Sequence, residues 1–127
     1  MAGPVASVLL PAKLTDERVA SIRDGIRRIA DSVTGSDFWI NQRPFILIVG
    51  PEYPEEMSEV RANGLPELLG WSPEDVVTFA AMCNGDEDHR VLAQLCIELA
   101  EKEAGVIDFG GHRCSLVLGS STRTSAW

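Results

Sequence analysis

The sequence predicts an α+β fold, in which a mostly antiparallel sheet carries two main helices on one face. Short apolar runs of strand length recur along the chain, and two longer segments repeat apolar residues at three- and four-residue intervals. The segments follow one another as strand, helix, strand, long connection, strand, helix and strand. This order is typical of the ferredoxin-like split β-α-β arrangement.

The N-terminal part is predicted to form one strand and one helix. Val5–Leu10 is a short apolar run that ends at Pro11, as expected of a strand. Thr15 is a suitable N-cap for the helix that follows, and acidic residues occupy the first turn. An apolar stripe at helical spacing predicts that this helix continues to about Val33. The stripe consists of Val19, Ile22, Ile26, Ile29 and Val33. The arginines expected on the solvated side are Arg18, Arg23, Arg27 and Arg28.

The middle of the chain is predicted to contain strands and then a long connection. Residues 37–42 alternate aromatic and polar side chains, and residues 44–49 are densely apolar, so they form either one bent strand or two successive strands. Residues 51–75 are punctuated by prolines and rich in glutamate. This composition predicts a connection with short helical fragments around Glu55–Ala62 and Leu65–Leu69.

A strand, a turn and the start of a second long helix are predicted next. Val76–Cys83 is rich in β-branched and small apolar residues, which favours a buried strand. Asn84 and Gly85 end it. The acidic residues 86–88 then favour a helix start, because unpaired N–H groups at that end attract negative charge.

The second long helix is predicted to bury one face and to end at a glycine. Gly105 is expected to close it with a positive φ, and Val106–Phe109 then resumes a strand pattern. A last apolar run covers Cys114–Leu118. Residues 1–119 are predicted to form a single domain, and residues 120–127 a flexible tail. The apolar face consists of Leu92, Leu95, Cys96 and Leu99, with Glu98, Glu101 and Lys102 expected mostly off that face.

The composition is that of an ordinary soluble globular protein, with 45% hydrophobic and 24% charged residues among 127. The N-terminal residues lack the basic and apolar pattern of a signal peptide or membrane span, so we expect a cytoplasmic protein without a membrane partner. Cys83, Cys96 and Cys114 show no CxxC spacing, which argues against a disulfide framework or zinc knuckle. Cys96 is expected in the core.

The charge is spread unevenly along the chain. The formal net charge is −8, but residues 51–103 alone carry −10, whereas residues 1–50 carry +1. Such a segment repels phosphate backbones, which disfavours nucleic acid as a partner, and it attracts a basic protein over a long range. The alternative is that the acidity serves solubility alone. The residues predicted to bind a partner protein are Glu52, Glu55, Glu56, Glu59 and Trp71.

Trp71 belongs to an apolar cluster in the same connection, together with Leu65, Leu68 and Leu69. Apolar side chains that gather in this way are covered either by the domain's own core or by a partner. The sequence favours the core.

The densest polar constellation surrounds the predicted start of the second long helix. Carboxylates and imidazole there would suit a divalent metal if they converged, and Cys83 with His89 would suit a cysteine hydrolase. No two of these residues have the i,i+4 spacing on a helix that makes a metal-ligand pair compelling, and nothing marks an oxyanion hole. We therefore predict no catalytic residue, no metal and no cofactor. A small metal-dependent or cysteine hydrolase that uses Asp86–His89 and Asp108 remains the alternative. The constellation comprises Asp86, Glu87, Asp88, His89, Asp108, His112 and Cys114.

Structural roles are predicted for the same region. Asp86 and Asp88 are expected to cap the helix, His89 to hydrogen-bond the turn from a buried position, and Asp108 to accept N–H groups from the glycines that follow it. The predicted structural motif consists of Asn84, Asp88, His89, Asp108, Gly110 and Gly111.

The sequence combines MCN at 82–84, DH at 88–89 and IDFGG at 107–111, preceded by ADSVTGSDFWI at 30–40 and LLGW at 68–71. This combination resembles a family of small uncharacterised bacterial proteins, classed as a domain of unknown function. The family implies no established activity. By analogy, such proteins resemble immunity proteins of bacterial toxin systems in size, acidity and lack of catalytic motifs. The matching residues of the central stretch are Met82, Cys83, Asn84, Asp88, His89, Leu92, Leu95, Leu99, Ala100, Gly105, Ile107, Asp108, Phe109, Gly110 and Gly111.

The expected function is therefore that of a small acidic binding protein rather than an enzyme. It would act as an immunity or inhibitor protein and neutralise a basic partner such as a bacterial toxin. A third alternative is a structural subunit that forms a homodimer through an exposed sheet edge.

Overall fold

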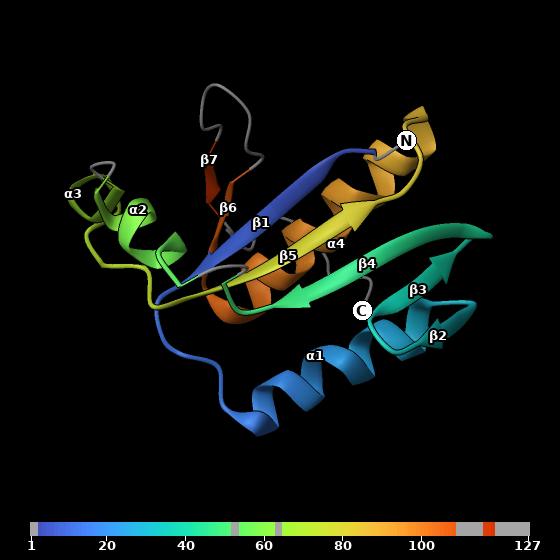
Figure 1. Cartoon of the computed structure of the whole chain (residues 1–127), viewed down its shortest axis with the longest axis horizontal. Coiled ribbons are helices and arrows are strands. Elements are labelled where there is room, and N and C mark those ends of the chain that lie inside the picture. The colour runs from blue at the N-terminus through green and yellow to red at the C-terminus, as the bar shows by residue number, and fades with distance from the viewer. Residues whose placement is uncertain (1–2, 52–53, 63–64, 109–115, 119–127) are drawn as a thin grey trace.

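The computed structural model describes residues 3–51, 54–62, 65–108 and 116–118. These residues form one open antiparallel sheet and four helices, so the predicted α+β class is confirmed (Figure 1). The strands are β1 (Val5–Leu10), β2 (Ser32–Thr34), β3 (Asp37–Ile40), β4 (Arg43–Val49), β5 (Asp75–Ala81), β6 (Val106–Asp108) and β7 (Leu116–Leu118). The helices are α1 (Asp16–Ile29), α2 (Glu56–Ala62), α3 (Leu65–Leu69) and α4 (Asp86–Glu103).

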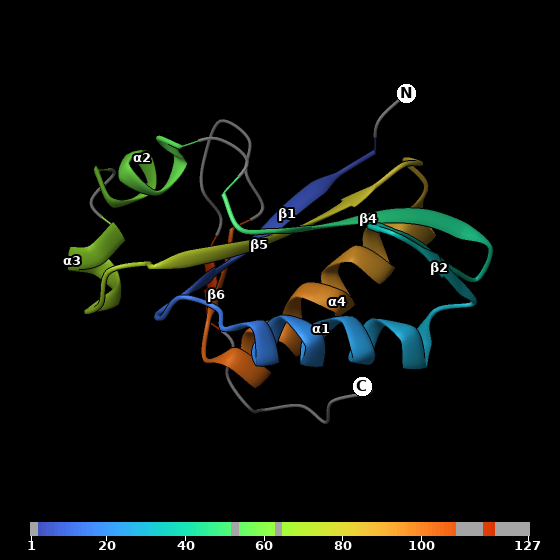
Figure 2. The same cartoon turned by 60° about the horizontal axis from the view of Figure 1, so that its bottom comes forward.

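The sheet has the strand order β2-β3-β4-β5-β1-β6-β7, and every neighbouring pair is antiparallel. Helix α1 lies in the connection from β1 to β4, with β5 between those two strands in the sheet, and α4 lies in the connection from β5 to β6, with β1 between them. The four inner strands therefore have the split β-α-β order that the sequence predicts. Both long helices cover the same face (Figure 2).

The main core lies between this face and the two long helices. Phe38, Phe45 and Phe79 are fully buried there, with ring centroids 5.6 Å apart for Phe38–Phe45 and 6.4 Å apart for Phe38–Phe79. Cys96 belongs to the same cluster, as predicted, and burial raises the pKa of its thiol to about 12. This aromatic packing links three strands that are consecutive in the sheet, β3, β4 and β5.

Helix α1 is shorter than the sequence predicts. It ends at Ile29, and Ala30 is already extended, with φ −83° and ψ 148°. Residues 32–34 instead form β2, which pairs with β3, and Val33 is 37% exposed. The prediction that the helix continues to Val33 is therefore wrong. Val33 fits the helical stripe by spacing alone, whereas Gly35 at φ 62° allows the tight turn that lets this β-branched residue pair in a strand.

The segment from 37 to 49 forms two strands rather than one bent strand. Asn41 and Gln42 both have positive φ values, 53° and 64°, and they join β3 to β4 directly. Two consecutive residues of this kind make the hairpin turn whose twist matches that of the flanking strands. The backbone N–H of Gln42 donates to Asp31 Oδ2 at 2.8 Å, which ties this turn to the start of β2.

The connection between β4 and β5 contains the two predicted short helices, α2 and α3. They lie at one end of the other sheet face, where Met57 packs with Leu9 and Val76 in a second, smaller core cluster (Figure 2). Leu69 and Trp71 are partly buried against this cluster, but Leu68 is 72% exposed. The domain's own core thus covers part of the predicted apolar cluster and leaves Leu68 in water.

Helix α4 ends differently from the prediction. The left-handed residue is Ala104, with φ 56° and ψ 38°, and Gly105 follows it. A Cβ atom on Gly105 would lie 2.6 Å from the Leu9 carbonyl oxygen and 2.8 Å from Val8 Cγ1. Gly105 is therefore needed for close packing against β1 rather than for a positive φ. None of the described helices combines the length and the hydropathy that a membrane crossing requires.

We expect the two neighbouring residues at this helix end to respond oppositely to substitution. Gly105→Ala should lower the free energy of unfolding by about 1 to 3 kcal/mol, because its methyl group overlaps β1. Ala104→Gly should raise it by about 0.5 to 1 kcal/mol, because glycine adopts a positive φ without strain. Urea denaturation of both variants measures these changes. Equal stability of Gly105→Ala and the unsubstituted protein would contradict the packing argument.

Candidate functional site

A polar cluster joins the start of α4 to the β3–β4 hairpin. Asp88, in the first turn of α4, is fully buried. Its Oδ2 accepts a hydrogen bond from the Gly85 N–H at 2.9 Å and an ion pair from Arg43 Nη1 at 2.7 Å. The first contact caps the helix, as the sequence predicts for Asp88. The second contact was not predicted, because Arg43 lies 45 residues earlier in the chain.

The charge on Asp88 is favoured by these contacts. Burial by itself raises the pKa of Asp88, but the Gly85 N–H and the Arg43 guanidinium outweigh burial and lower this pKa below its ordinary value. Within the described part of the chain, Asp88 Oδ1 is buried and accepts no hydrogen bond. The carboxylate therefore serves as a fixed negative charge that holds Arg43 of β4 against α4.

The neighbours of Asp88 form contacts on the surface. His89 is exposed, so the prediction of a buried position is wrong. Its Nε2 donates a hydrogen bond to Asn84 Oδ1 at 2.9 Å. Glu87 accepts two hydrogen bonds from Arg90, at 3.2 and 2.5 Å, and one from Asn41 of the hairpin turn at 3.3 Å. The contact with Arg90 is the main reason why the pKa of Glu87 is lowered. These contacts continue the attachment of the α4 start to the hairpin.

The structure does not bring Asp108 to this cluster. Its neighbour in β6, Ile107, belongs to the main core beneath the helices, so Asp108 faces the opposite side of the sheet. Its Cα partner across the ladder is Ser7, whose hydroxyl meets Thr78 at 2.8 Å. Among the described residues, no three His, Cys, Asp or Glu side chains gather as metal ligands. Gly110 and Gly111, with His112 and Cys114, lie outside those residues.

The residues predicted to bind a partner lie mainly on and around α2. Glu55 and Glu59 are exposed and Glu56 is partly exposed, whereas Glu52 lies outside the described residues. Glu67 of α3 is also exposed and directly precedes the exposed Leu68. Trp71 is partly buried against the second core cluster. Its indole is thus used, at least in part, inside the domain.

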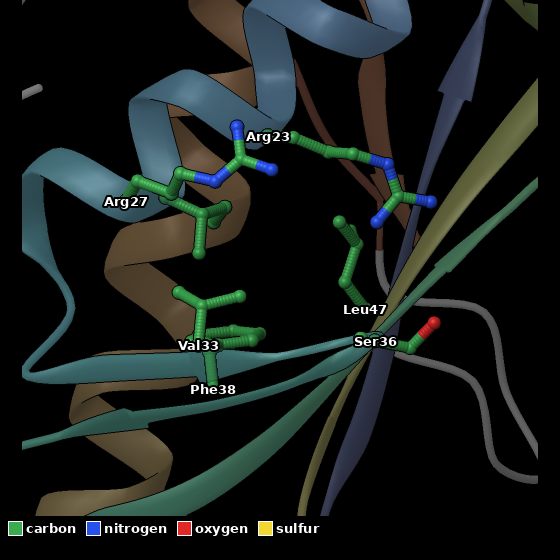
Figure 3. A pocket seen from close by; sticks show the side chains of 8 residues that line it. Arg23, Arg27, Val33, Ser36, Phe38 and Leu47 are labelled. Atoms are coloured by element: carbon green, nitrogen blue, oxygen red, sulfur yellow. The ribbon is translucent and has the colours of Figure 1, made fainter.

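One hollow lies between α1 and the strands β2, β3 and β4. Figure 3 shows Arg23 and Arg27 extending from α1 over this hollow, with Val33, Phe38 and Leu47 on its other side. Arg27 also donates to Asp24 at 2.8 Å. The hollow is shallow, with about 10 Å³ of free space, which is about what one water molecule requires. These arginines were expected on a solvated face, and the structure places two of them at the rim of an apolar depression.

The sequence analysis did not predict a second hollow. It is a groove beside α4, at the end of α1 and of β3, with about 200 Å³ of free space. Glu98 lines this groove and is only 3% exposed, although helical spacing predicted that it lies mostly off the buried face of α4. Glu103 is also buried, because it pairs with Arg18 of α1. The missing information was the position of α1, which covers this flank of α4 and cannot be read from helical spacing alone. The groove is lined by Ile29, Ile40, Asn41, Arg90, Val91, Gln94, Leu95 and Glu98.

Comparison with known proteins identifies a family. Residues 2–118 match the model of a family described as "Family of unknown function (DUF6368)". No curated protein and no solved structure matches the chain.

We expect the charge on Asp88 to stabilise the fold in a pH-dependent way. Its pKa is lower in the folded chain than in the unfolded chain, so its stabilisation is complete above the ordinary aspartate value of about 4 and is lost as the pH falls through the lower folded value. Asp88→Asn should therefore lower the melting temperature at pH 7 by roughly 5 °C. The difference from the unsubstituted protein should narrow below about pH 4. Circular dichroism melts of both proteins between pH 7 and pH 2.5 measure this difference in melting temperature.

Asp86→Asn is the matched control, because Asp86 is exposed in the same helical turn. Its melting temperature should stay close to that of the unsubstituted protein at every pH. A difference for Asp88→Asn that stays constant down to pH 2.5 would show that shape rather than charge makes Asp88 important.

Proposed function

Because the chain belongs to the Family of unknown function (DUF6368), we propose its function from its own surface, as a cytoplasmic binding protein that captures a basic protein partner. The proposed role is that of an immunity or inhibitor protein that neutralises a bacterial toxin. The observation that carries the proposal is the exposed Leu68 beside exposed carboxylates on α2 and α3. The two described cysteines, Cys83 and Cys96, are both free thiols, in keeping with a reducing compartment.

The surface around Leu68 has the composition of a small binding epitope. A leucine that is 72% exposed offers apolar area that a partner can remove from water. Glu59 of α2 and Glu67 of α3 supply exposed charges on the same pair of helices, which pack against each other, and the exposed Glu55 directly precedes α2. An apolar centre with a charged rim is the usual arrangement of a protein interface, in which the centre contributes affinity and the rim contributes specificity.

The charge of the segment supports a basic partner rather than an acidic one. Residues 51–103 carry a net charge of −10, but six of their 13 acids lie on α4, which covers the opposite face of the sheet. Residues 54–71, which include α2 and α3, carry four acids and one arginine, a net charge of −3. The three described acids at α2 and just before it, Glu55, Glu56 and Glu59, lie close together in sequence, and Glu55 and Glu59 are exposed while Glu56 is partly exposed. A cationic protein would be drawn toward this side of the molecule before contact, and salt would weaken that attraction.

We expect neutralisation of this surface to slow association. Glu55→Gln, Glu56→Gln and Glu59→Gln together should lower the association rate constant roughly three- to tenfold at low salt, because long-range attraction falls with the charge. The dissociation rate and the free energy of unfolding should change little, the latter by less than about 0.5 kcal/mol. The partner is first identified by co-purification with the products of adjacent genes, and stopped-flow mixing at low and high salt then measures association.

The matched control removes the same charge elsewhere. Glu17→Gln, Asp24→Asn and Asp37→Asn neutralise three exposed acids on α1 and β3. This variant should associate at nearly the unsubstituted rate. Equal slowing in both variants would mean that only net charge matters, and an unchanged rate in the α2 variant would mean that the acids serve solubility alone.

A further inference from the structure

A third hollow, with about 320 Å³ of free space, lies where α2 meets the start of β5, on the sheet face opposite the long helices (Figure 2). One water molecule requires roughly 10 to 15 Å³, so this space can accept a small molecule. Its lining combines an apolar part, from Pro51, Pro54 and the buried Met57, with side chains of both charges. A ligand that fills the hollow must therefore match both kinds of lining.

Hydrogen bonds fasten the walls of this hollow to one another. Arg61 of α2 donates from Nε to the Pro73 carbonyl oxygen at 2.9 Å, which holds α2 against the segment that enters β5. Asp75 Oδ2 accepts from the Leu14 N–H at 2.9 Å, which holds the loop after β1 at the same place. Lys13 directly precedes Leu14 and also lines the hollow. The lining thus comes from three segments that are attached to one another rather than from one loop.

Hydrogen-bond donors on one part of the lining favour a ligand with a carboxylate. Lys13 and Ser58 make no hydrogen bond within the described part of the chain, so the ammonium and the hydroxyl are open to a ligand. Arg61 Nη2 lies 3.8 Å from Glu74 Oε1, which is beyond hydrogen-bond distance. A carboxylate accepts charge-assisted hydrogen bonds from both ammonium and guanidinium groups, so it would satisfy these donors.

Two carboxylates of the lining disfavour a ligand that is only an anion. Glu74 and Asp75 equal in number the two cations of the hollow, and the exposed acids beside α2 make the surroundings negative. Asp75 already accepts from two backbone N–H groups, through Oδ2 and through Oδ1. Glu74 is partly exposed, and its carboxylate is therefore the more open of the two to an ammonium group.

We propose that this hollow binds a free α-amino acid with an aliphatic side chain. The α-carboxylate lies at Lys13 and Arg61, the α-ammonium at Glu74, and the side chain against Met57, whose flexible thioether adapts to its shape. A purely apolar molecule would cover the charged groups without providing partners for them, and a small ion would leave the apolar part of the lining unused. The inference goes beyond the proposed function and does not depend on it.

Leucine and two relatives that each lack one charge test this assignment. The full chain labelled with ¹⁵N is titrated with L-leucine, with N-acetyl-L-leucine, which has no ammonium, and with L-leucinamide, which has no carboxylate. Amide shifts are followed by NMR. We expect saturable shifts on residues that line the hollow, and dissociation constants at least about tenfold larger for both relatives, because each loses charge-assisted hydrogen bonds. Equal binding of all three, shifts outside the hollow, or no saturable shift with leucine would overturn the inference.

Two variants assign the two ends of the ligand. Lys13→Gln should weaken leucine binding about tenfold without weakening that of leucinamide, which has no carboxylate to lose a partner. Glu74→Gln should weaken leucine binding about tenfold without weakening that of N-acetyl-leucine. Lys13 is exposed and Glu74 partly exposed, so both variants should remain folded, which circular dichroism melts check. Variants that weaken all three compounds alike would contradict the assigned orientation and overturn the inference.

Arg28→Gln and Asp86→Asn are the matched controls, because each removes one exposed charge from a helix on the other face of the sheet. Both should bind leucine as the unsubstituted protein does. Equal weakening in the controls would show general electrostatic attraction and overturn the site. An α2 variant that associates normally with a basic partner would overturn the proposed function alone, and selective leucine binding would then still support the amino-acid site.

Discussion

The fold depends on the removal of the two central strands, β1 and β5, from water. Their side chains alternate between two clusters, with Val8 and Phe79 beneath the long helices and Leu9 and Val76 beneath α2. Full burial of each large apolar side chain contributes about 1.5 to 3 kcal/mol, whereas an exposed ion pair contributes about 0 to 1 kcal/mol. The surface pairs of α1 and α4 therefore adjust a structure that apolar burial has already determined. The acidic surface can vary in charge without loss of the fold for the same reason.

A buried ion pair then fixes how the helical layer meets the sheet. Apolar packing is non-directional and would tolerate small rotations of α4, but Asp88 accepts from both its own helix start and Arg43 of β4. Burying this carboxylate has a desolvation cost that only the correct geometry offsets. The same geometry positions Arg90 against Glu87 and Asn41 beside the groove. The arrangement of the hairpin relative to α4 thus determines the wall of the groove that Asn41 lines.

The sequence was sufficient for the architecture and insufficient for the site. The long helices, the inner strands and the two short helices follow from apolar periodicity and from prolines, which act within a few residues. Val33 fits both a helical stripe and a short strand, and only pairing with β3 decides between them. For a related reason, Glu98 was predicted mostly off the buried face, and the position of Asp108 relative to the start of α4 was left open. The neighbours of a side chain depend on which elements pack together. The hairpin turn at Asn41 and Gln42 carried no glycine to indicate its positive φ values.

The ends of the described sheet are short. Strand β2 has three residues, all exposed, and β7 also has three, so each edge presents few unpaired N–H and C=O groups. A foreign strand that paired there would form only a small ladder, which is a common protection of antiparallel sheets against fibre formation. A protein with such edges presents little backbone through which its copies could polymerise. Short edges of this kind, in the described part of the sheet, favour recognition by side chains over strand addition.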